Sequence, residues 1–89
     1  MYEFRWNIQN ISHIGEHFVD PPEAEYVVNH PAAGFPRREA DAKFRAWGQT
    51  SAGRYLQVVY VFDPPDVVYV IHARSLTERE KRLLRRRRK

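Results

Sequence analysis

The stretch that decides the fold is KFRAWGQTSAGRYLQVVYVFDPPDVVYVIHARSLTEREKRL, residues 43–83. Three apolar runs cross it, and the middle one, RYLQVVYVF, is rich in the β-branched and aromatic side chains that favour strands. The runs occupy residues 44–48, 54–62 and 67–74. Between the first two lies Gly53, which can take the positive φ of a hairpin turn, and between the last two lies DPPD, whose prolines have no amide hydrogen to donate to a ladder. We therefore predict an antiparallel meander of three strands.

The residues before the meander supply a further strand and two helices. Residues 2–6 alternate like a short strand, and Asn7 can cap a helix over residues 8–17. A second helix begins after the N-cap Asp20, with proline in its first turn. Residues 31–42 mix proline, glycine and charge without a period, so we expect a loop there.

A charged helix follows the meander directly. Thr77 and Glu80 have the S/T-x-x-E spacing of a capping box, in which each side chain accepts a hydrogen bond from the backbone amide of the other residue. We expect Leu76, Glu80, Leu83 and Leu84 to mark the helix face nearest the sheet. The elements together predict an α+β fold: a small antiparallel sheet, made of the meander and the N-terminal strand, with helices packed on one side.

The composition fits one small domain. The chain has 89 residues and 43% hydrophobic content, so a single core can hold it, and we place the domain at residues 1–84 with a basic C-terminal tail at 85–89. There is no cysteine, which excludes disulfides, thiolate metal sites and thiol nucleophiles. No apolar run approaches the ~20 residues that span a bilayer, so we expect a cytoplasmic protein without a membrane partner.

The net charge of +4 is unevenly distributed. Residues 79–89 hold eight basic residues and one acidic residue, whereas residues 1–78 hold seven basic and ten acidic residues. A basic end on an acidic chain favours a polyanionic partner, either nucleic acid or an acidic protein segment. For residues 85–89 the alternative is a solvated tail without a partner.

The HIGEH segment, residues 13–17, matches the H-x-x-E-H spacing of inverted zinc proteases. On a helix, His13 and His17 would lie four residues apart on one face. A catalytic zinc site also needs a third protein ligand and an open position, which so short a chain is poorly suited to supply. We therefore expect no metal or other cofactor, and we expect His17 to end the helix, where an imidazolium suits the helix dipole.

Arginine residues recur along the meander beside a histidine. Strand alternation puts Arg45 on the same face as Trp47, and His72 on the same face as Arg74. A ribonuclease without a metal needs a base for the 2′-hydroxyl, a cation for the phosphorane oxyanion and an acid for the leaving 5′-oxygen. Our candidate catalytic residues are Arg45, His72, Arg74 and Glu80. Our candidate RNA-binding residues, whose rings can stack bases and whose guanidinium groups can hold phosphate, are Trp47, Arg54, Tyr69 and Arg82.

Each of these candidates also has a structural alternative. Arginines commonly end strands at a protein surface without any catalytic role. Glu80 already has a role as a capping residue. The residues taken alone therefore leave catalysis and structure as open alternatives.

Several motifs succeed one another along the chain. In order they are W-x3-N at Trp6 and Asn10, a histidine at position 17, F-R-A-W-G at 44–48, G-R-x-L-x-V-V at 53–59 and V-I-H-A-R-x-L-T-x-x-E-K-R at 70–82. That succession resembles the BrnT family of toxins over nearly the whole chain, and its most specific part is the last motif. The family is similar to RelE-type endoribonucleases in fold and activity.

The resemblance implies roles for individual residues. The positions that match the family pattern are His17, Arg45, Arg74, Thr77, Glu80 and Arg82. The chain departs from that pattern at Glu16 and Phe18, which replace a lysine and a glycine, so one positive charge is lost near the first helix. His72 stands where many members carry a serine, and it can add an acid–base group there.

The resemblance implies the toxin of a type II toxin–antitoxin system, a metal-independent endoribonuclease that cleaves RNA and inhibits translation. Its partner would be a BrnA-like antitoxin, a ribbon-helix-helix protein that binds DNA, covers the basic surface of the toxin and can build a higher-order toxin–antitoxin complex. The alternative is a non-catalytic module that binds nucleic acid or protein through its basic C-terminal helix. A small zinc hydrolase is the third hypothesis.

Overall fold

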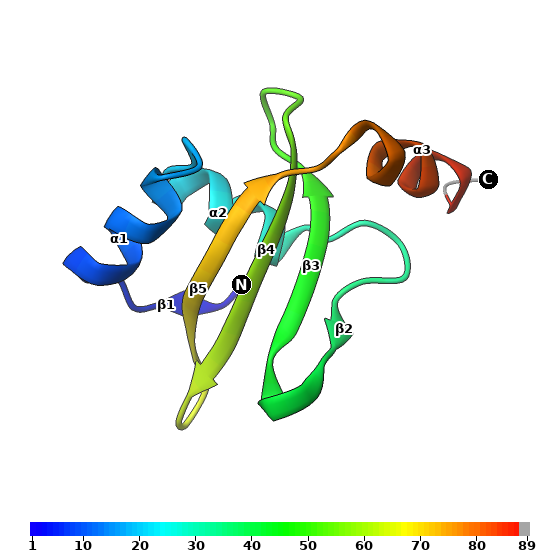
Figure 1. Ribbon diagram of the computed structural model, residues 1–89. Coiled ribbons are helices and arrows are strands. Elements are labelled where there is room, and N and C mark those ends of the chain that lie inside the picture. The colour runs from blue at the N-terminus through cyan, green and yellow to red at the C-terminus, as the bar shows by residue number, and fades with distance from the viewer. Residues whose placement is uncertain (88–89) are drawn as a thin grey trace.

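Five strands form one mixed sheet in the order β1-β5-β4-β3-β2 (Figure 1). The computed structural model describes residues 1–87. Its elements are β1 (Glu3–Phe4), α1 (Ile8–Gly15), α2 (Pro21–Asn29), β2 (Arg37–Arg38), the 3-10 helix η1 (Ala40–Ala42), β3 (Phe44–Gln49), β4 (Tyr55–Asp63), β5 (Val67–Ser75) and α3 (Glu78–Arg87). The predicted α+β class is confirmed.

The predicted meander forms the centre of the sheet. Strands β3, β4 and β5 pair antiparallel, and Gly53 takes a φ of 94° in the first turn. A bulge between Val59 and Tyr60 shifts the register, so that Val59 faces His72 and Tyr60 faces Val70. Bulges of this kind re-aim side chains along a strand.

Two parts of the sheet differ from the prediction. β1 pairs parallel with β5, so the sheet is mixed and not wholly antiparallel. The predicted loop at 31–42 contains β2, which pairs antiparallel with β3, as well as η1. A strand of two residues is too short to show alternation, so its sequence carries no strand signal.

The sheet has one face that is fully packed, which we call the packed face. It consists of Ala46, Leu56, Val58, Tyr60, Val68, Val70 and Ala73, all at most 1% exposed. Helix α2 covers it with Ala24, Val27 and Val28. Gly48 permits this close approach, because a Cβ there would lie 3.2 Å from Val27 Cγ1 and 3.3 Å from the His30 carbonyl oxygen.

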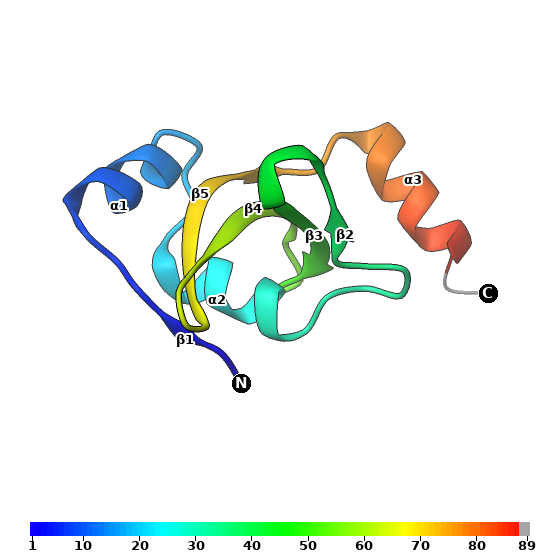
Figure 2. The same ribbon diagram turned by 90° about the horizontal axis from the view of Figure 1, so that it is seen from below.

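The opposite face, which we call the polar face, lies between two helices. α1 runs beside β5 and contributes Ile14 to the core. Leu84 of α3 and Leu76, which lies just before that helix, pack against Trp47. Figure 2 shows α2 below the sheet with α1 and α3 toward its other side. Helices α1 and α2 both contribute to the core under the packed face, as expected, whereas α3 packs on the other face. Because Trp47 alternates with Ala46 along β3, a helix that packs on Trp47 must lie on the face away from α2.

The helix ends largely follow the predicted capping residues. Asn7 caps α1, Asp20 caps α2, and Thr77 and Glu80 form the capping box of α3. Leu84 is buried as expected, whereas Leu83 is 41% exposed and does not face the sheet.

The ends of the two outer helices fall at Gly15 and Arg87. α1 ends at Gly15, two residues before the predicted end. α3 continues to Arg87, so residues 85–87 extend the helix, and the rest of the predicted tail, 88–89, lies outside the described residues. In residues 1–87, no helix combines the length and apolar character that a bilayer crossing requires.

Candidate active site

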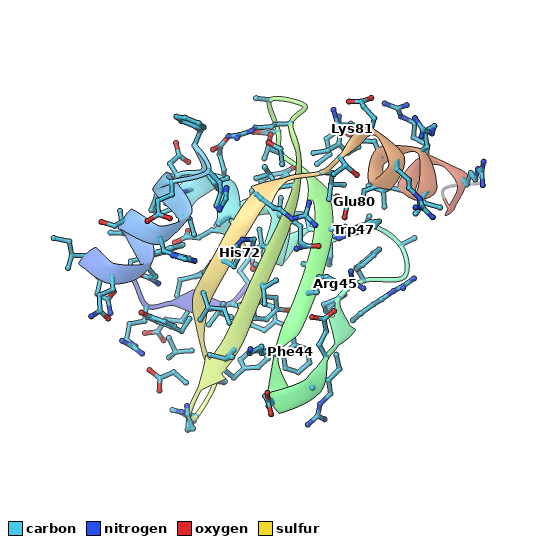
Figure 3. The ribbon with its side chains drawn as sticks, viewed as in Figure 1. Phe44, Arg45, Trp47, His72, Glu80 and Lys81 are labelled. Atoms are coloured by element: carbon cyan, nitrogen blue, oxygen red, sulfur yellow. The ribbon has the colours of Figure 1, made fainter. Side chains whose placement is uncertain are left out.

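Two rows of side chains cross the polar face. Arg45 pairs with Val59, which pairs with His72 on the far side; in the next row Trp47 pairs with Gln57, which pairs with Arg74. Side chains of residues two apart on a strand share a face, so both rows point the same way. Figure 3 shows Arg45 and Trp47 on β3, His72 on β5, and Glu80 at the start of α3.

Arg74 is held by a carboxylate from α3. Its Nη1 and Nη2 atoms donate to the two Glu80 oxygens at 2.8 and 2.9 Å, and Nη2 also lies 3.3 Å from Gln57 Oε1. Glu80 accepts the Thr77 amide at 2.8 Å as well. The hydrogen bonds from Arg74, and secondarily those from Thr77, lower the pKa of Glu80 to about 2. Glu80 is thus an ionised carboxylate that orients the guanidinium, and it is poorly suited to give or take protons near neutral pH.

Arg45 is held less completely. Its Nε lies 3.0 Å from Glu39 Oε2, and its guanidinium carbon lies 5.5 Å from the centre of the Trp47 ring. Nε is buried, and in the described part of the chain no acceptor is aligned to take its hydrogen. The side chain is 27% exposed, so the guanidinium reaches the surface of the polar face.

His72 is surrounded by cationic and imidazole groups. The ring of His17 lies 5.2 Å from the His72 ring, centre to centre, and the ring of His13 lies at 5.9 Å. Burial lowers the pKa of His72 below its ordinary 6.5, and the nearby His17, His13 and Arg74 lower that pKa further. His72 is therefore unprotonated at neutral pH, the state in which an imidazole can accept a proton.

The three histidines do not form a metal centre in the described residues. Because α1 ends at Gly15, His17 lies in the turn after the helix and not one turn below His13 on the same helix face. Among residues 1–87, no group of three or more histidine, aspartate or glutamate side chains is placed to hold a metal ion. The H-x-x-E-H segment instead places the imidazole rings of His13 and His17 beside that of His72.

The residues predicted to bind RNA lie in four different settings. Trp47 is 7% exposed, stacks on Phe35 at 4.9 Å between ring centres and donates its indole hydrogen to Gln57 at 2.9 Å. Tyr69 is partly exposed on the polar face, where the Arg5 guanidinium lies 4.3 Å from its ring centre. Arg82 is exposed on α3.

Arg54 is bound to other parts of the fold. Its guanidinium donates to Glu23 at 3.0 Å, to the carbonyl oxygens of Phe18 and His17, and to Ser75 Oγ. These bonds fasten the turn between α1 and α2 to the sheet. The structure therefore does not add Arg54 to the group formed by Arg45, His72 and Arg74.

Sequence reasoning missed some residues of the group. The sequence places His13 and His17 at a helix terminus or in a zinc spacing, whereas the structure places both rings near His72. The sequence indicated only that two histidines belong to a predicted helix, residues 8–17, that could pack on the sheet. Glu39 and Gln57 carried no signal, because their roles depend on strand register.

Comparisons with known proteins bear on the fold. No family model and no curated protein sequence matches this chain. Among solved structures, the chain is similar to the crystal structure of the Brucella abortus ribonuclease toxin BrnT, with a TM-score of 0.63 and 18% sequence identity over 88% of this chain and 100% of that chain. At that identity the likeness shows a BrnT-like fold.

Proposed function

We propose that this protein is a metal-independent endoribonuclease and the toxin of a type II toxin–antitoxin system. The observation that carries the proposal is an unprotonated imidazole, His72, on the same sheet face as the guanidinium groups of Arg45 and Arg74. A general base beside fixed cations is the equipment that RNA cleavage without a metal requires. The BrnT-like fold supports the same conclusion by analogy.

The reaction joins the ribose 2′-oxygen to the neighbouring phosphorus. His72 accepts the 2′-hydroxyl proton as that bond forms, and Arg45 and Arg74 stabilise the negative charge that collects on the phosphorane oxygens. The bond from phosphorus to the 5′-oxygen then breaks, and that oxygen takes a proton. The products are a 2′,3′-cyclic phosphate and a 5′-hydroxyl, and no water or oxidant is consumed.

We assign delivery of the proton to the 5′-oxygen to His17, whose ring centre lies 5.2 Å from that of His72. Glu80 is excluded from this role because its pKa of about 2 leaves it without a proton at neutral pH. His17 is the imidazole nearest to His72, and it also matches a histidine of the BrnT pattern. Glu80 and Gln57 are positioning residues, which hold the Arg74 guanidinium in place.

Cleavage is tested with purified protein, single-stranded RNA and excess EDTA. We expect fragments that carry 2′,3′-cyclic phosphate and 5′-hydroxyl ends, and none from the His72→Ala variant. Intact RNA in the presence of protein that melts cooperatively would contradict the proposal. Fragments that appear only when a divalent cation is added would contradict the metal-independent mechanism alone.

The toxin role is tested in cells. Expression of the protein alone should stop growth and translation, and co-expression of a BrnA-like ribbon-helix-helix protein should restore both. The antitoxin covers the basic surface in this proposal, and the pair can assemble into a higher-order complex. A cytoplasmic location follows from a substrate that is cellular RNA. Normal growth with folded, RNA-cleaving protein would remove the toxin role and leave the nuclease.

One observation favours a non-catalytic binding module as a second candidate. Helix α3 displays the exposed cations Arg79, Arg82, Arg85 and Arg86. A module that held RNA only by its phosphates would bind with an affinity that falls steeply as salt rises, and it would form no product. Salt-dependent binding without cleavage, in wild type and in His72→Ala alike, would select this alternative.

A further inference from the structure

A pocket lies between β2, β3 and α3, beside the polar face. It has a volume of about 240 Å³ and is lined by Phe35, Arg37, Trp47, Leu83 and Arg86. Its walls are two aromatic rings and a leucine, with one arginine from the sheet edge and one from the helix. The volume is below the ~300–1,000 Å³ of clefts that hold drug-sized ligands, so the pocket suits a single flat ring.

Two arginines give this pocket a positive charge. Arg45 and Arg74 are each paired with a carboxylate, whereas in residues 1–87 no ion pair involves Arg37 or Arg86. The Arg37 guanidinium lies over the Phe35 ring, 4.8 Å from its centre. A larger cavity of about 430 Å³ between α2 and α3 has neither arginine nor lysine in its lining. The smaller pocket is therefore the one that offers two guanidinium donors to a ligand.

The pocket is continuous with the proposed phosphate-binding group. Trp47 forms part of its wall and donates to Gln57, and Gln57 also accepts from Arg74. Figure 3 shows Trp47 on β3 beside α3, close to Glu80. An RNA strand whose phosphate lies on Arg74 would thus have an adjacent nucleotide at the mouth of the pocket.

We propose that this pocket holds one unpaired nucleobase next to the scissile phosphate, which makes single-stranded RNA the substrate class. The inference rests on the proposed function. A base offers a flat face to the apolar walls and the guanidinium planes, and its edge can offer acceptors to two side chains that only donate. A base within a duplex has both faces stacked on its neighbours and cannot enter.

The test uses an RNA oligonucleotide with one cleavable ribose and 2′-O-methyl groups elsewhere, so that the scissile phosphate is defined. An abasic nucleotide is placed in turn just before and just after that phosphate. At one of the two positions we expect kcat/KM of the wild-type protein to fall about 5- to 100-fold, the size of effect that base stacking supplies. In the Leu83→Ala/Arg86→Ala double variant, the abasic nucleotide at that position should lower kcat/KM less than about 3-fold. The effect is smaller because this variant already lacks the leucine wall and one of the two guanidinium donors that would contact the base. Arg79→Ala removes an equal charge from the same helix outside the pocket, and it should keep the wild-type dependence.

A binding measurement separates this inference from the proposed function. In the Trp6→Phe background Trp47 is the only tryptophan, so its fluorescence reports on the pocket. A non-cleavable oligonucleotide, with 2′-O-methyl at every ribose, should change that fluorescence, and its abasic counterpart should not. This result can be obtained even if no RNA is cleaved.

Three outcomes would overturn the inference. The first is a wild-type protein that treats the abasic and complete substrates alike in cleavage and in binding. The second is a double variant that keeps the full dependence on the base. The third is a double variant that handles RNA normally but no longer binds a co-expressed antitoxin, which would assign the pocket to a protein partner.

Discussion

The two faces of the central sheet are built from the same three strands and have opposite properties. On the packed face, Leu56, Val58 and Val70 are fully buried under α2. The polar face of the same strands carries His72 and Arg74, which lie in a partly exposed surface between α1 and α3. The comparison teaches that a single strand can serve both purposes, because its alternate side chains point to opposite faces. Those on one face stabilise the core, and those on the other are available for chemistry.

The division is not complete, because the charges of the polar face have to be neutralised. Glu80 pairs with Arg74 and Glu39 with Arg45. Half-buried ion pairs contribute little net stability compared with apolar packing, since desolvation offsets much of the attraction. These pairs therefore serve mainly to fix geometry, and substitutions on the two faces should separate accordingly.

The largest expected effect is that of His72→Ala on cleavage. Loss of a general base should lower kcat/KM by about 10²–10⁴ while the melting temperature changes little. Only unprotonated His72 can accept the 2′-proton, so wild-type activity should rise with pH through a pKa that lies below 6.5. The variant should lack that rising limb in a pH–rate profile. A variant that keeps the limb would assign the base to another group.

Arg74→Ala should have the next largest effect. Removal of a group that stabilises the phosphorane oxyanion should lower kcat/KM by about 10²–10³. Arg74→Lys keeps the charge but loses the fork that holds Glu80 and the phosphate, so it should recover only part of the activity. The measurement is single-turnover cleavage with the protein in excess over RNA and below saturation, which gives kcat/KM. Full activity in either variant would remove Arg74 from the mechanism.

A substitution on the packed face should change stability and leave cleavage unaffected. Leu56→Ala should lower the free energy of unfolding by about 2–5 kcal/mol, because it leaves a cavity under α2. Cleavage per folded molecule should not change. Val59→Ala is the matched substitution on the polar face, where the side chain is only partly buried, and urea unfolding should show a smaller loss. Equal losses would mean that the polar face packs as tightly as the other.

Glu80→Gln should have the smallest effect, and it should change both the stability of the protein and its rate of cleavage. The pKa of Glu80 is lowered from 4.5 to about 2 in the folded protein, so its stabilisation is present above pH 4.5 and is lost as the pH falls toward 2. The variant should lose about 1 kcal/mol of unfolding free energy at pH 7, because solvent screens this partly exposed pair, and still less at pH 2. As a positioning residue, Glu80 should affect kcat more than KM. A stability difference that is independent of pH would contradict this account.

Local signals in the sequence were sufficient for much of the fold. The meander, the caps Asn7, Asp20 and Thr77, and the shared face of His72 and Arg74 depend on residues close together in the chain. The parallel pairing of β1 with β5 joins segments more than sixty residues apart, and no local pattern encodes it. Such long-range pairings are decided by packing of the whole chain.

The candidate site divides in the same way. Alternation along β3 and β5 was enough to place Arg45 and Arg74 on one surface. The bulge between Val59 and Tyr60 is not visible in that pattern, and it determines that Val59 lies opposite His72. The approach of His13 and His17 to His72 depends on how α1 packs beside β5. The pocket beside Trp47 depends on the position of α3, which follows from the burial of Leu84 and not of Leu83.

The carboxylate of Glu80 has a consequence that reaches beyond the site. One side chain closes the first turn of α3 and grips the Arg74 guanidinium, so helix integrity and cation orientation are a single cooperative event. Any partner that unwinds or lifts this end of α3 would disable the surface remotely, without occupying the space where the substrate lies.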